Sequence, residues 1–280
     1  MEKQSTIIED ILSKDNLNRA YQQVIKNKGA AGVDGMECEG LLSHLRANGT
    51  QLRESVRNQS YKPMPVKRVE IPKEDGSKRN LGIPTVTDRL IQQAVAQVLT
   101  PIYEKVFHRN SYGFRPGKSA QQAVLKAVEY MNGGYNWVVD IDLEKFFDTV
   151  NHNKLISILN KEIKDGKVLS LIRKFLVSGV MVGEHVEETE IGTPQGGNLS
   201  PLLANIILNE LDWELEKRKL KFVRYADDCI ILVRSQKAAQ RVMDSISKYI
   251  ESKLFLKVNR KKSKIGRPTE IKYLGFTFYN

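Results

Sequence analysis

Two adjacent aspartates set between two short apolar segments constrain the fold more than any other feature of this sequence. Residues 222–223 and 230–233 are apolar, and Tyr225-Ala226-Asp227-Asp228 lies between them. Apolar runs of this length around a polar break are typical of a β-hairpin, with the aspartates at its tip. Asp-Asp is also ordinary turn chemistry, so the pair alone does not establish a function.

A second acidic cluster follows an earlier apolar segment. Residues 137–141 are predicted to form a strand, and Asp140 and Asp142 then point to the same side of the sheet because side chains alternate along a strand. From there on, strands alternate with helices, with the last two strand segments at 230–233 and 273–278. This order resembles a split βαβ unit and predicts an α+β fold, with an antiparallel sheet backed by helices.

If strand 137–141 lies beside the hairpin, Asp142 and Asp227 converge at one end of the sheet. Clustered carboxylates repel one another, and a bound divalent cation relieves the repulsion. Oxygen ligands without nearby His or Cys suit Mg²⁺. Two such ions about 3.5–4 Å apart would activate an attacking 3′-oxygen and stabilise a leaving pyrophosphate, which is nucleotidyl-transfer chemistry.

The charge of the chain favours a nucleic-acid partner. Its 280 residues contain 44 Lys and Arg against 33 Asp and Glu, which gives a net charge of +11. No segment approaches the run of about 20 apolar residues that a membrane span needs. The N-terminus has no signal-peptide pattern. We therefore expect a cytoplasmic protein without a membrane partner. Cys38 and Cys229 lie too far apart in sequence to indicate a zinc site or a disulfide framework.

Helix and hairpin signals precede and separate the acidic strands. Residues 88–103 have the apolar spacing of an amphipathic helix. Ser119 with Gln122 forms a capping-box pattern, and Ser200-Pro201 is typical of a helix N-cap and first turn. Residues 66–71 and 79–83 flank a turn sequence and predict a basic hairpin.

Several motifs in order resemble the reverse transcriptases, most closely the group II intron-encoded branch. Tyr225-Ala-Asp-Asp follows residues 142–148 (DLEKFFD) and 192–201 (GTPQGGNLSP), and the resemblance runs from about residue 17 to residue 278. It implies the fingers and palm of a right-hand polymerase. Residues 1–36 would form an N-terminal extension and the start of the fingers, 37–136 mainly the fingers, and 137–280 mainly the palm, with interleaved boundaries. We expect the thumb to be absent.

The resemblance assigns the chemistry to Asp142, Asp227 and Asp228 as catalytic residues and ligands of two Mg²⁺ ions, for which Mn²⁺ could substitute. Asp140 would have a structural role or lie behind the metal ligands. Asp148 is expected to cap the entry of the next helix.

Further residues would bind the incoming dNTP. Phe147 would lie beneath the sugar and reject a ribose 2′-hydroxyl, with Phe146 in the core because adjacent strand residues face opposite sides. The resemblance places Lys73 and Arg79 on the triphosphate and Gln195 on the dNTP. A solvated charged hairpin is the alternative for Lys73 and Arg79.

Other positions would contact the pyrophosphate or the nucleic acid. Lys262 or Lys264, in a basic run, would lie near the departing pyrophosphate, with Lys262 preferred; a solvent-facing run is the alternative. Tyr273 and Gly275 resemble the primer-grip turn, although an ordinary edge strand would explain them too. Arg115 and Lys118 suit phosphate or base contacts.

The resemblance implies an RNA-directed DNA polymerase that copies RNA into DNA during intron retrohoming and takes part in maturase-assisted RNA splicing. Its partners would be group II intron RNA, an RNA template with a DNA primer, and dNTPs; a homodimer is left open. One alternative is a retron or diversity-generating reverse transcriptase. Another is a non-catalytic RNA-binding splicing scaffold, and a third is an RNA-dependent RNA polymerase, against which Phe147 argues.

Overall fold

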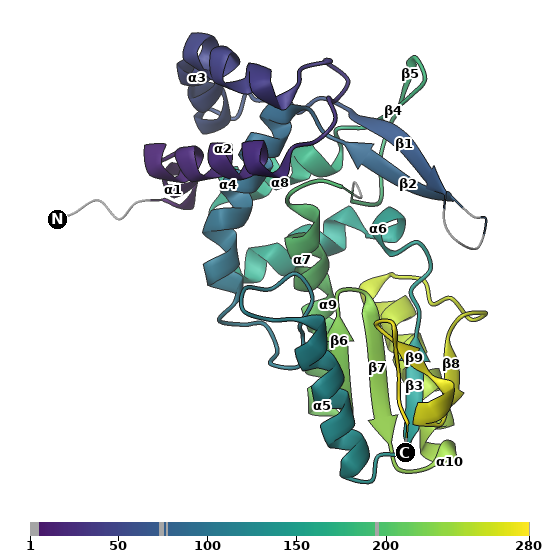
Figure 1. Cartoon of the computed structure of the whole chain (residues 1–280). Helices are drawn as coiled ribbons and strands as arrows, with labels where there is room; N and C mark the ends of the chain where they lie inside the picture. Colours follow the sequence, from purple (N-terminus) through teal and green to yellow (C-terminus); the bar gives the residue numbers. More distant parts are fainter. Residues whose placement is uncertain (1–5, 73–75, 77, 194–195, 280) are drawn as a thin grey trace, which may run out of the picture. The chain divides into compact units, whose positions relative to one another are not determined.

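The computed structural model describes residues 6–72, 76, 78–193 and 196–279. The chain divides into two units, and Figure 1 labels most of their helices and strands. Unit 1 contains Met1–Tyr103 and Leu155–Ser200, and unit 2 contains Glu104–Lys154 and Pro201–Asn280. Each unit is therefore built from two separate stretches of the chain.

Unit 1 is built around helix α4, Val86–Tyr103, which confirms the helix predicted at residues 88–103. Helices α1 and α2 pack against it, and buried Asn16 in α2 donates a 3.0 Å hydrogen bond to the Ala94 carbonyl. The helices of this unit are α1 Ile7–Ile11, α2 Lys14–Asn27, the 3₁₀ turn Cys38–Gly40, α3 Leu41–Arg57, α4, most of α7 His152–Glu162, and α8 Gly166–Leu176.

A buried carboxylate holds the start of α4. Asp88 accepts hydrogen bonds from the Tyr61 hydroxyl at 2.5 Å, the Thr85 hydroxyl at 2.7 Å and the Met64 amide at 3.1 Å. Burial raises the pKa of Asp88 above its ordinary value, and the hydrogen bonds partly oppose this rise. Asp88 thereby ties the helix to the segment that leads into the sheet of unit 1.

That sheet has four strands in the order β2-β1-β4-β5. The predicted basic hairpin is confirmed as β1 Val66–Pro72 and β2 Lys78–Ile83, which pair antiparallel. Two strands of three residues each, β4 Val180–Val182 and β5 His185–Glu187, were not predicted. Strand β4 pairs parallel with β1, so the hairpin is part of a larger sheet and not a separate element.

Unit 2 contains an antiparallel sheet in the order β6-β7-β3-β8. Its strands are β3 Trp137–Ile141, β6 Lys221–Tyr225, β7 Asp228–Val233 and β8 Lys264–Gly266. The expected pairing of the first acidic strand with the aspartate hairpin is confirmed, because β3 lies directly beside β7. The fourth strand, β8, was not predicted.

Helices flank this sheet. Helix α5 begins with the predicted Ser119–Gln122 capping box and packs on β6 and β7, and α10 packs on β3, β7 and β8. Ser200 is the first residue of α9 and not its N-cap, a shift of one position. The bounds are α5 Ala120–Asn132, α6 Phe146–Thr149, α9 Ser200–Lys217, α10 Gln236–Tyr249, the π-helical turn Ile250–Leu254 and the 3₁₀ turn Pro268–Glu270.

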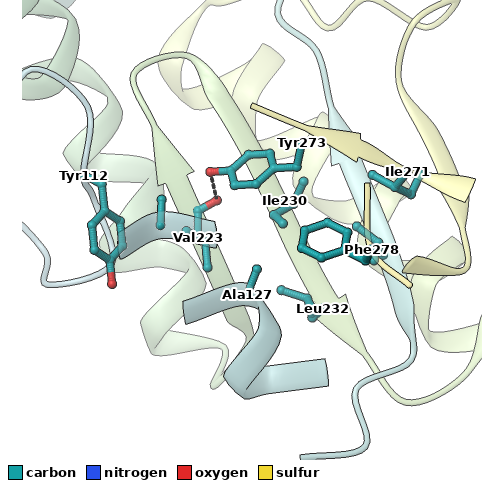
Figure 2. Close-up of a cluster of buried hydrophobic side chains, with 10 residues drawn as sticks. Tyr112, Ala127, Val223, Ile230, Leu232, Ile271, Tyr273 and Phe278 are labelled. Atoms are coloured by element: carbon teal, nitrogen blue, oxygen red, sulfur yellow. Dashed lines mark hydrogen bonds between the residues drawn. The ribbon is translucent and has the colours of Figure 1, made fainter. Parts of the chain in front are cut away.

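The prediction of one strand over residues 273–278 was wrong. Two short strands, β9 Lys272–Tyr273 and β10 Phe276–Thr277, pair with each other outside the four-stranded sheet. Leu274 and Gly275 form the turn with φ of 51° and 85°, and no continuous strand can pass through two left-handed residues. Figure 2 shows Tyr273, Ile271 and Phe278 packed over one face of the four-stranded sheet, in a buried cluster with Val223, Ile230 and Leu232.

Candidate active site

The pairing of β3 with β7 brings three carboxylates to one face of the unit 2 sheet. Asp140 lies opposite Ile230, and Ile141 lies opposite Cys229. The next positions are Asp142, immediately after β3, and Asp228, the first residue of β7. Because side chains alternate, Asp140, Asp142 and Asp228 share the face of Val138 and Ile230. This face is therefore apolar at one end, where Figure 2 shows the cluster, and acidic at the other.

Burial and neighbouring charge both perturb the carboxylates on this face. Asp228 keeps contact with solvent, yet desolvation by the surrounding protein, followed by the neighbouring carboxylates, raises its pKa to about 6. The carboxylates responsible are those of Asp227, Asp140 and Asp142. Desolvation also raises the pKa of Asp140 to about 6. A face that resists full ionisation is one that a cation would stabilise.

Asp227 lies in a two-residue turn. Tyr225 pairs with Asp228, which leaves Ala226 and Asp227 as the connection between β6 and β7. Ala226 has φ of 55°, a left-handed value at the first central position, where hairpin turns of type II′ favour glycine. The turn thus places Asp227 beside Asp228 at the cost of backbone strain in Ala226.

The basic run after α10 fixes the end of β3. The Asp142 amide donates to the Ser263 hydroxyl at 3.0 Å, and the Asp142 carbonyl accepts from the Asn259 amide at 2.8 Å. Lys257 also pairs with Glu144 at 2.8 Å. The run therefore has a structural role in holding Asp142.

Between the two lysines left open by the sequence, the structure brings Lys264 to the carboxylates. Lys264 lies in β8 directly opposite Asp140 and lowers the pKa of that carboxyl, partly offsetting the effect of desolvation. Lys262 is exposed in the preceding turn, where its amide bonds to Asn259. The preference for Lys262, which came from the resemblance, stays a prediction.

Phe146 is buried and Phe147 is half-buried, as expected, but the stated reason was wrong. Both residues belong to the short helix α6 and not to a strand. Their rings meet edge to face at a centroid distance of 5.1 Å. Asp148 also lies inside α6; the Asn151 side chain instead accepts from the Lys154 amide at 2.9 Å and caps α7.

Three residues expected to contact nucleic acid have contacts within unit 2. The Arg115 guanidinium, 5% exposed, pairs with Glu104 at 2.8 Å and donates to the His108 and Ser111 carbonyls. The ring of Tyr273 is buried, and its hydroxyl donates to the Val223 carbonyl at 3.4 Å (Figure 2). Arg115 and Tyr273 thus have structural roles here. Lys118 lies over the Tyr112 ring, and Gly275 is exposed in the β9–β10 turn.

Two predicted dNTP contacts, Lys73 and Gln195, lie outside the described residues. Arg79 lies in β2 opposite Ile71. Among the described residues, no three acidic, His or Cys side chains converge into a ready-made metal cage. Mg²⁺ does not require one, because it keeps several waters and combines one or two carboxylates with substrate phosphates. The all-oxygen donor set of the acidic face fits this chemistry.

Sequence reasoning missed one buried group behind the site. Arg224, in β6, is fully buried and pairs with fully buried Asp212 at 2.6 Å. A charged residue inside an apolar strand predicts a buried partner, because an unpaired charge is costly to desolvate. That signal was present in the sequence at Arg224.

Comparison with known proteins agrees with this geometry. Residues 71–278 match the family described as "Reverse transcriptase (RNA-dependent DNA polymerase)". The chain therefore belongs to the reverse transcriptase family. Members of this family generally use divalent metal ions.

Similar proteins point to the group II intron branch. The chain is 42% identical to the group II intron-encoded protein LtrA of Lactococcus lactis subsp. cremoris over 79% of this chain and 37% of that protein. It is 33% identical to protein YkfC of Escherichia coli (strain K12), over 94% of this chain and 78% of that protein. The chain thus spans little more than a third of LtrA. The predicted intron-encoded reverse transcriptase type is confirmed.

Solved structures confirm the expected α+β polymerase fold. A chain of a partial Cas6-RT-Cas1–Cas2 complex is 28% identical, with a TM-score of 0.55, and the alignment covers 88% of this chain and 43% of that chain. Telomerase from Candida tropicalis, solved with a fragment of telomeric RNA, shares the fold at 14% identity and a TM-score of 0.58, over 82% of this chain and 46% of that chain. No helix in the described residues is both long and apolar enough to cross a membrane.

Proposed function

We propose that this chain is the RNA-directed DNA polymerase domain of a group II intron-encoded protein, which extends a DNA primer on an RNA template. The observation that carries the proposal is the pairing of β3 with β7, which brings Asp140, Asp142 and Asp228 to one end of a sheet face, beside the turn that contains Asp227. Membership of the reverse transcriptase family supports it. The proposed partners are RNA template, DNA primer and dNTPs, in the cytoplasm.

Asp142, Asp227 and Asp228 are the residues that would hold the metal, which we propose to be two Mg²⁺ ions with Mn²⁺ as a substitute. When bound, such ions activate the attacking 3′-oxygen and neutralise the leaving pyrophosphate. The protein's contribution is position: Ser263 and Asn259 fix the backbone of Asp142, and the β6–β7 turn fixes Asp227. Lys264, beside Asp140, would place a positive charge near the departing pyrophosphate.

For dNTP binding we propose roles that rest on the family resemblance. Lys73 and Arg79 would contact the triphosphate, Gln195 the nucleotide, and Phe147 the sugar. The partial exposure of Phe147 next to buried Phe146 supports that choice between the two rings. Lys118 and the Gly275 turn would contact nucleic acid, whereas contacts within the protein occupy the Arg115 and Tyr273 side chains.

The test is extension of a DNA primer on an RNA template with Mg²⁺ and dNTPs, comparing the wild type with Asp227→Asn. Asp142→Asn should behave like Asp227→Asn, and thermal melting establishes that each variant is folded. The proposal requires extension by the wild type alone. Equal extension by wild type and Asp227→Asn would contradict it, as would a folded wild type that binds primer-template and extends nothing.

A second candidate function, binding of group II intron RNA in maturase-assisted splicing and retrohoming, is favoured by the net charge of +11 and by the similarity to LtrA. Binding to cognate intron RNA should exceed binding to an unrelated RNA of equal length at high salt, where non-specific phosphate contacts weaken. Equal affinities for the two RNAs would leave only generic cationic binding. The same assay under Asp227→Asn separates RNA binding from polymerisation.

A further inference from the structure

A fully buried network lies directly behind the β6–β7 turn that carries Asp227. Its centre is the guanidinium of Arg224, three residues before Asp227 in the sequence. Arg224 and Asp212 are 0% exposed, Ser111 is 0% and Asn205 is 1% exposed. The network joins β6 to helix α9 and to the loop before α5.

Every N–H of the Arg224 guanidinium has a partner. Nε and Nη2 donate to the two Asp212 carboxylate oxygens at 2.7 and 2.6 Å, and Nη2 also donates to the Ser111 hydroxyl at 2.8 Å. Nη1 donates to the Asn205 side-chain oxygen at 2.9 Å and to the Ala226 carbonyl at 2.7 Å. Asp212, Ser111 and Asn205 thus fix the plane of the guanidinium. Its remaining N–H donates to the backbone of the turn.

The Ala226 carbonyl is the atom that makes this contact consequential. It belongs to the peptide that joins Ala226 to Asp227, so a bond at this oxygen fixes the orientation of that peptide plane. Ala226 is in a left-handed conformation with φ of 55°, which an alanine adopts only when its surroundings hold it there. Asn205 adds a second constraint, because its amide donates to the Gly113 carbonyl at 2.8 Å and the Gly113 backbone packs against Ala226.

Stability does not account for this network. A buried ion pair repays its desolvation only with excellent geometry, and apolar replacements of both partners are often neutral or stabilising. A pair retained for stability would also have no need to contact the left-handed residue of a turn. The directed contact from Nη1 to Ala226 requires an explanation in the geometry of the turn itself.

We propose that Arg224, neutralised by Asp212 and oriented by Asn205, is a positioning residue that fixes the Ala226–Asp227 peptide and thereby the direction of the Asp227 carboxylate. This inference rests on the proposed polymerase function and deepens it. Arg224 is fully buried, so it acts on the reaction through the turn and not by contact with substrate.

The test removes the contact without leaving a buried charge. The double variant Arg224→Met with Asp212→Leu replaces the ion pair by apolar side chains, and Asn205→Ala removes one orienting acceptor with no change of charge. Asn209→Ala is the matched control: it lies one turn further along α9 and also bonds to loop backbone, at His108 and Val106, away from the turn. Folding is measured by circular dichroism and thermal melting.

Two readouts separate positioning from folding. The first is Mn²⁺ binding to the protein with primer-template, followed by electron paramagnetic resonance of free Mn²⁺; the second is the split between kcat and KM for dNTP in primer extension. We expect Mn²⁺ affinity and kcat to fall by about 10–100-fold in the double variant, less in Asn205→Ala, with KM and primer-template affinity unchanged. Asn209→Ala should match the wild type.

Wild-type Mn²⁺ binding and kcat in the folded double variant would overturn the positioning role. If the double variant does not fold, Asn205→Ala decides: weakened Mn²⁺ binding supports the role, and wild-type binding overturns it. A wild type that neither binds Mn²⁺ nor extends a primer would refute the proposed polymerase function, and the positioning role with it. An active wild type beside active variants refutes the positioning role alone.

Discussion

Replacement of Gly113 by alanine should displace the turn that carries Asp227. A Cβ on Gly113 would lie 2.2 Å from the Ala226 nitrogen, 2.9 Å from the Tyr225 carbonyl carbon and 3.0 Å from the Ala226 Cα. Ordinary contact begins at 3.4 Å, so the closest approach is about 1.2 Å too short. All three atoms are backbone, and no side-chain rotation relieves the clash. The turn or the loop must therefore move by roughly 1 Å.

Two effects of different size should follow. Overpacking in a buried site costs about 1–3 kcal/mol of unfolding free energy, which a urea titration monitored by circular dichroism would measure. A displacement of about 1 Å at a catalytic group reduces the rate by about 100-fold, which single-turnover primer extension would measure. A protein with a stability of several kcal/mol remains mostly folded after losing about 1–3 kcal/mol. The loss of activity should therefore greatly exceed what partial unfolding explains.

Gly134→Ala is the control for this prediction. Gly134 lies in the same unit and, unlike Gly113, has a left-handed φ of 85°, but its Cβ would meet only the flexible end of the Arg234 side chain, at 3.0 Å. It should lose about 1 kcal/mol of stability through backbone strain and keep normal extension. Gly113→Ala that extends primers at the wild-type rate, with stability reduced or not, would refute the argument that the Gly113 contact sets the turn.

Three further predictions address other parts of the molecule. Phe146→Ala should reduce the free energy of unfolding by about 3–5 kcal/mol in urea titrations, because Phe146 is buried, whereas Phe147→Ala should remain folded and raise ribonucleotide incorporation in primer extension; the reverse pattern would refute the assignment. Asp88→Asn should cost about 1–3 kcal/mol in the same titration, because the new NH2 group faces another donor in either orientation: the Tyr61 hydroxyl at the Oδ1 position, or the Met64 amide at the Oδ2 position. Burial lowers the pKa of His108 below 6.5 in the folded chain. As pH falls, the unfolded chain therefore takes up a proton at this histidine at a higher pH than the folded chain does, and stability should decline below pH 6.5. An equal decline in His108→Gln, measured by thermal melting across that range, would show that another group is responsible.

Local sequence patterns predicted the elements that carry the chemistry. The alternation that puts Asp140 and Asp142 on one side of β3 depends only on strand geometry, and it held because β3 is a regular strand. The Ser119–Gln122 capping box is likewise a contact between residues three apart. Such features follow from the chain near each residue, so the sequence contains them in full.

Elements defined by distant partners could not be predicted in the same way. Strand β8 has three residues, Lys264–Gly266, and exists because β3 offers it a free edge. The apolar segment 273–278 alternates like a strand, yet Leu274 and Gly275 turn it back on itself. Whether this segment forms one strand or two short strands joined by a turn depends on the packing of Tyr273 and Phe278 over the sheet, which no local pattern encodes.

Charged residues were the hardest to assign, because their role depends on which partner reaches them first. Arg115 was assigned to nucleic acid by its place in a basic motif, but Glu104 and two carbonyls occupy its guanidinium. Lys264 was given second place, yet pairing across β8 brings it to Asp140. Charge and motif identify candidates, and only the contacts separate structural cations from those that are left to bind phosphate.

At the acidic end of the sheet, the sequence motif and the tertiary contacts of Arg224 must be considered together. The motif that contains Asp227 and Asp228 predicts which side chains face the substrate, but a left-handed alanine between two strands does not hold itself in place. The strain in the turn must be balanced by contacts that favour this conformation over a relaxed one. The bond from Arg224 to the Ala226 carbonyl and the packing of Gly113 are contacts of that kind, and both act on the same peptide. In the proposed polymerase, the Asp227 carboxylate must meet a metal ion within a few tenths of an ångström, and its direction would depend on a buried cation that does not reach the substrate.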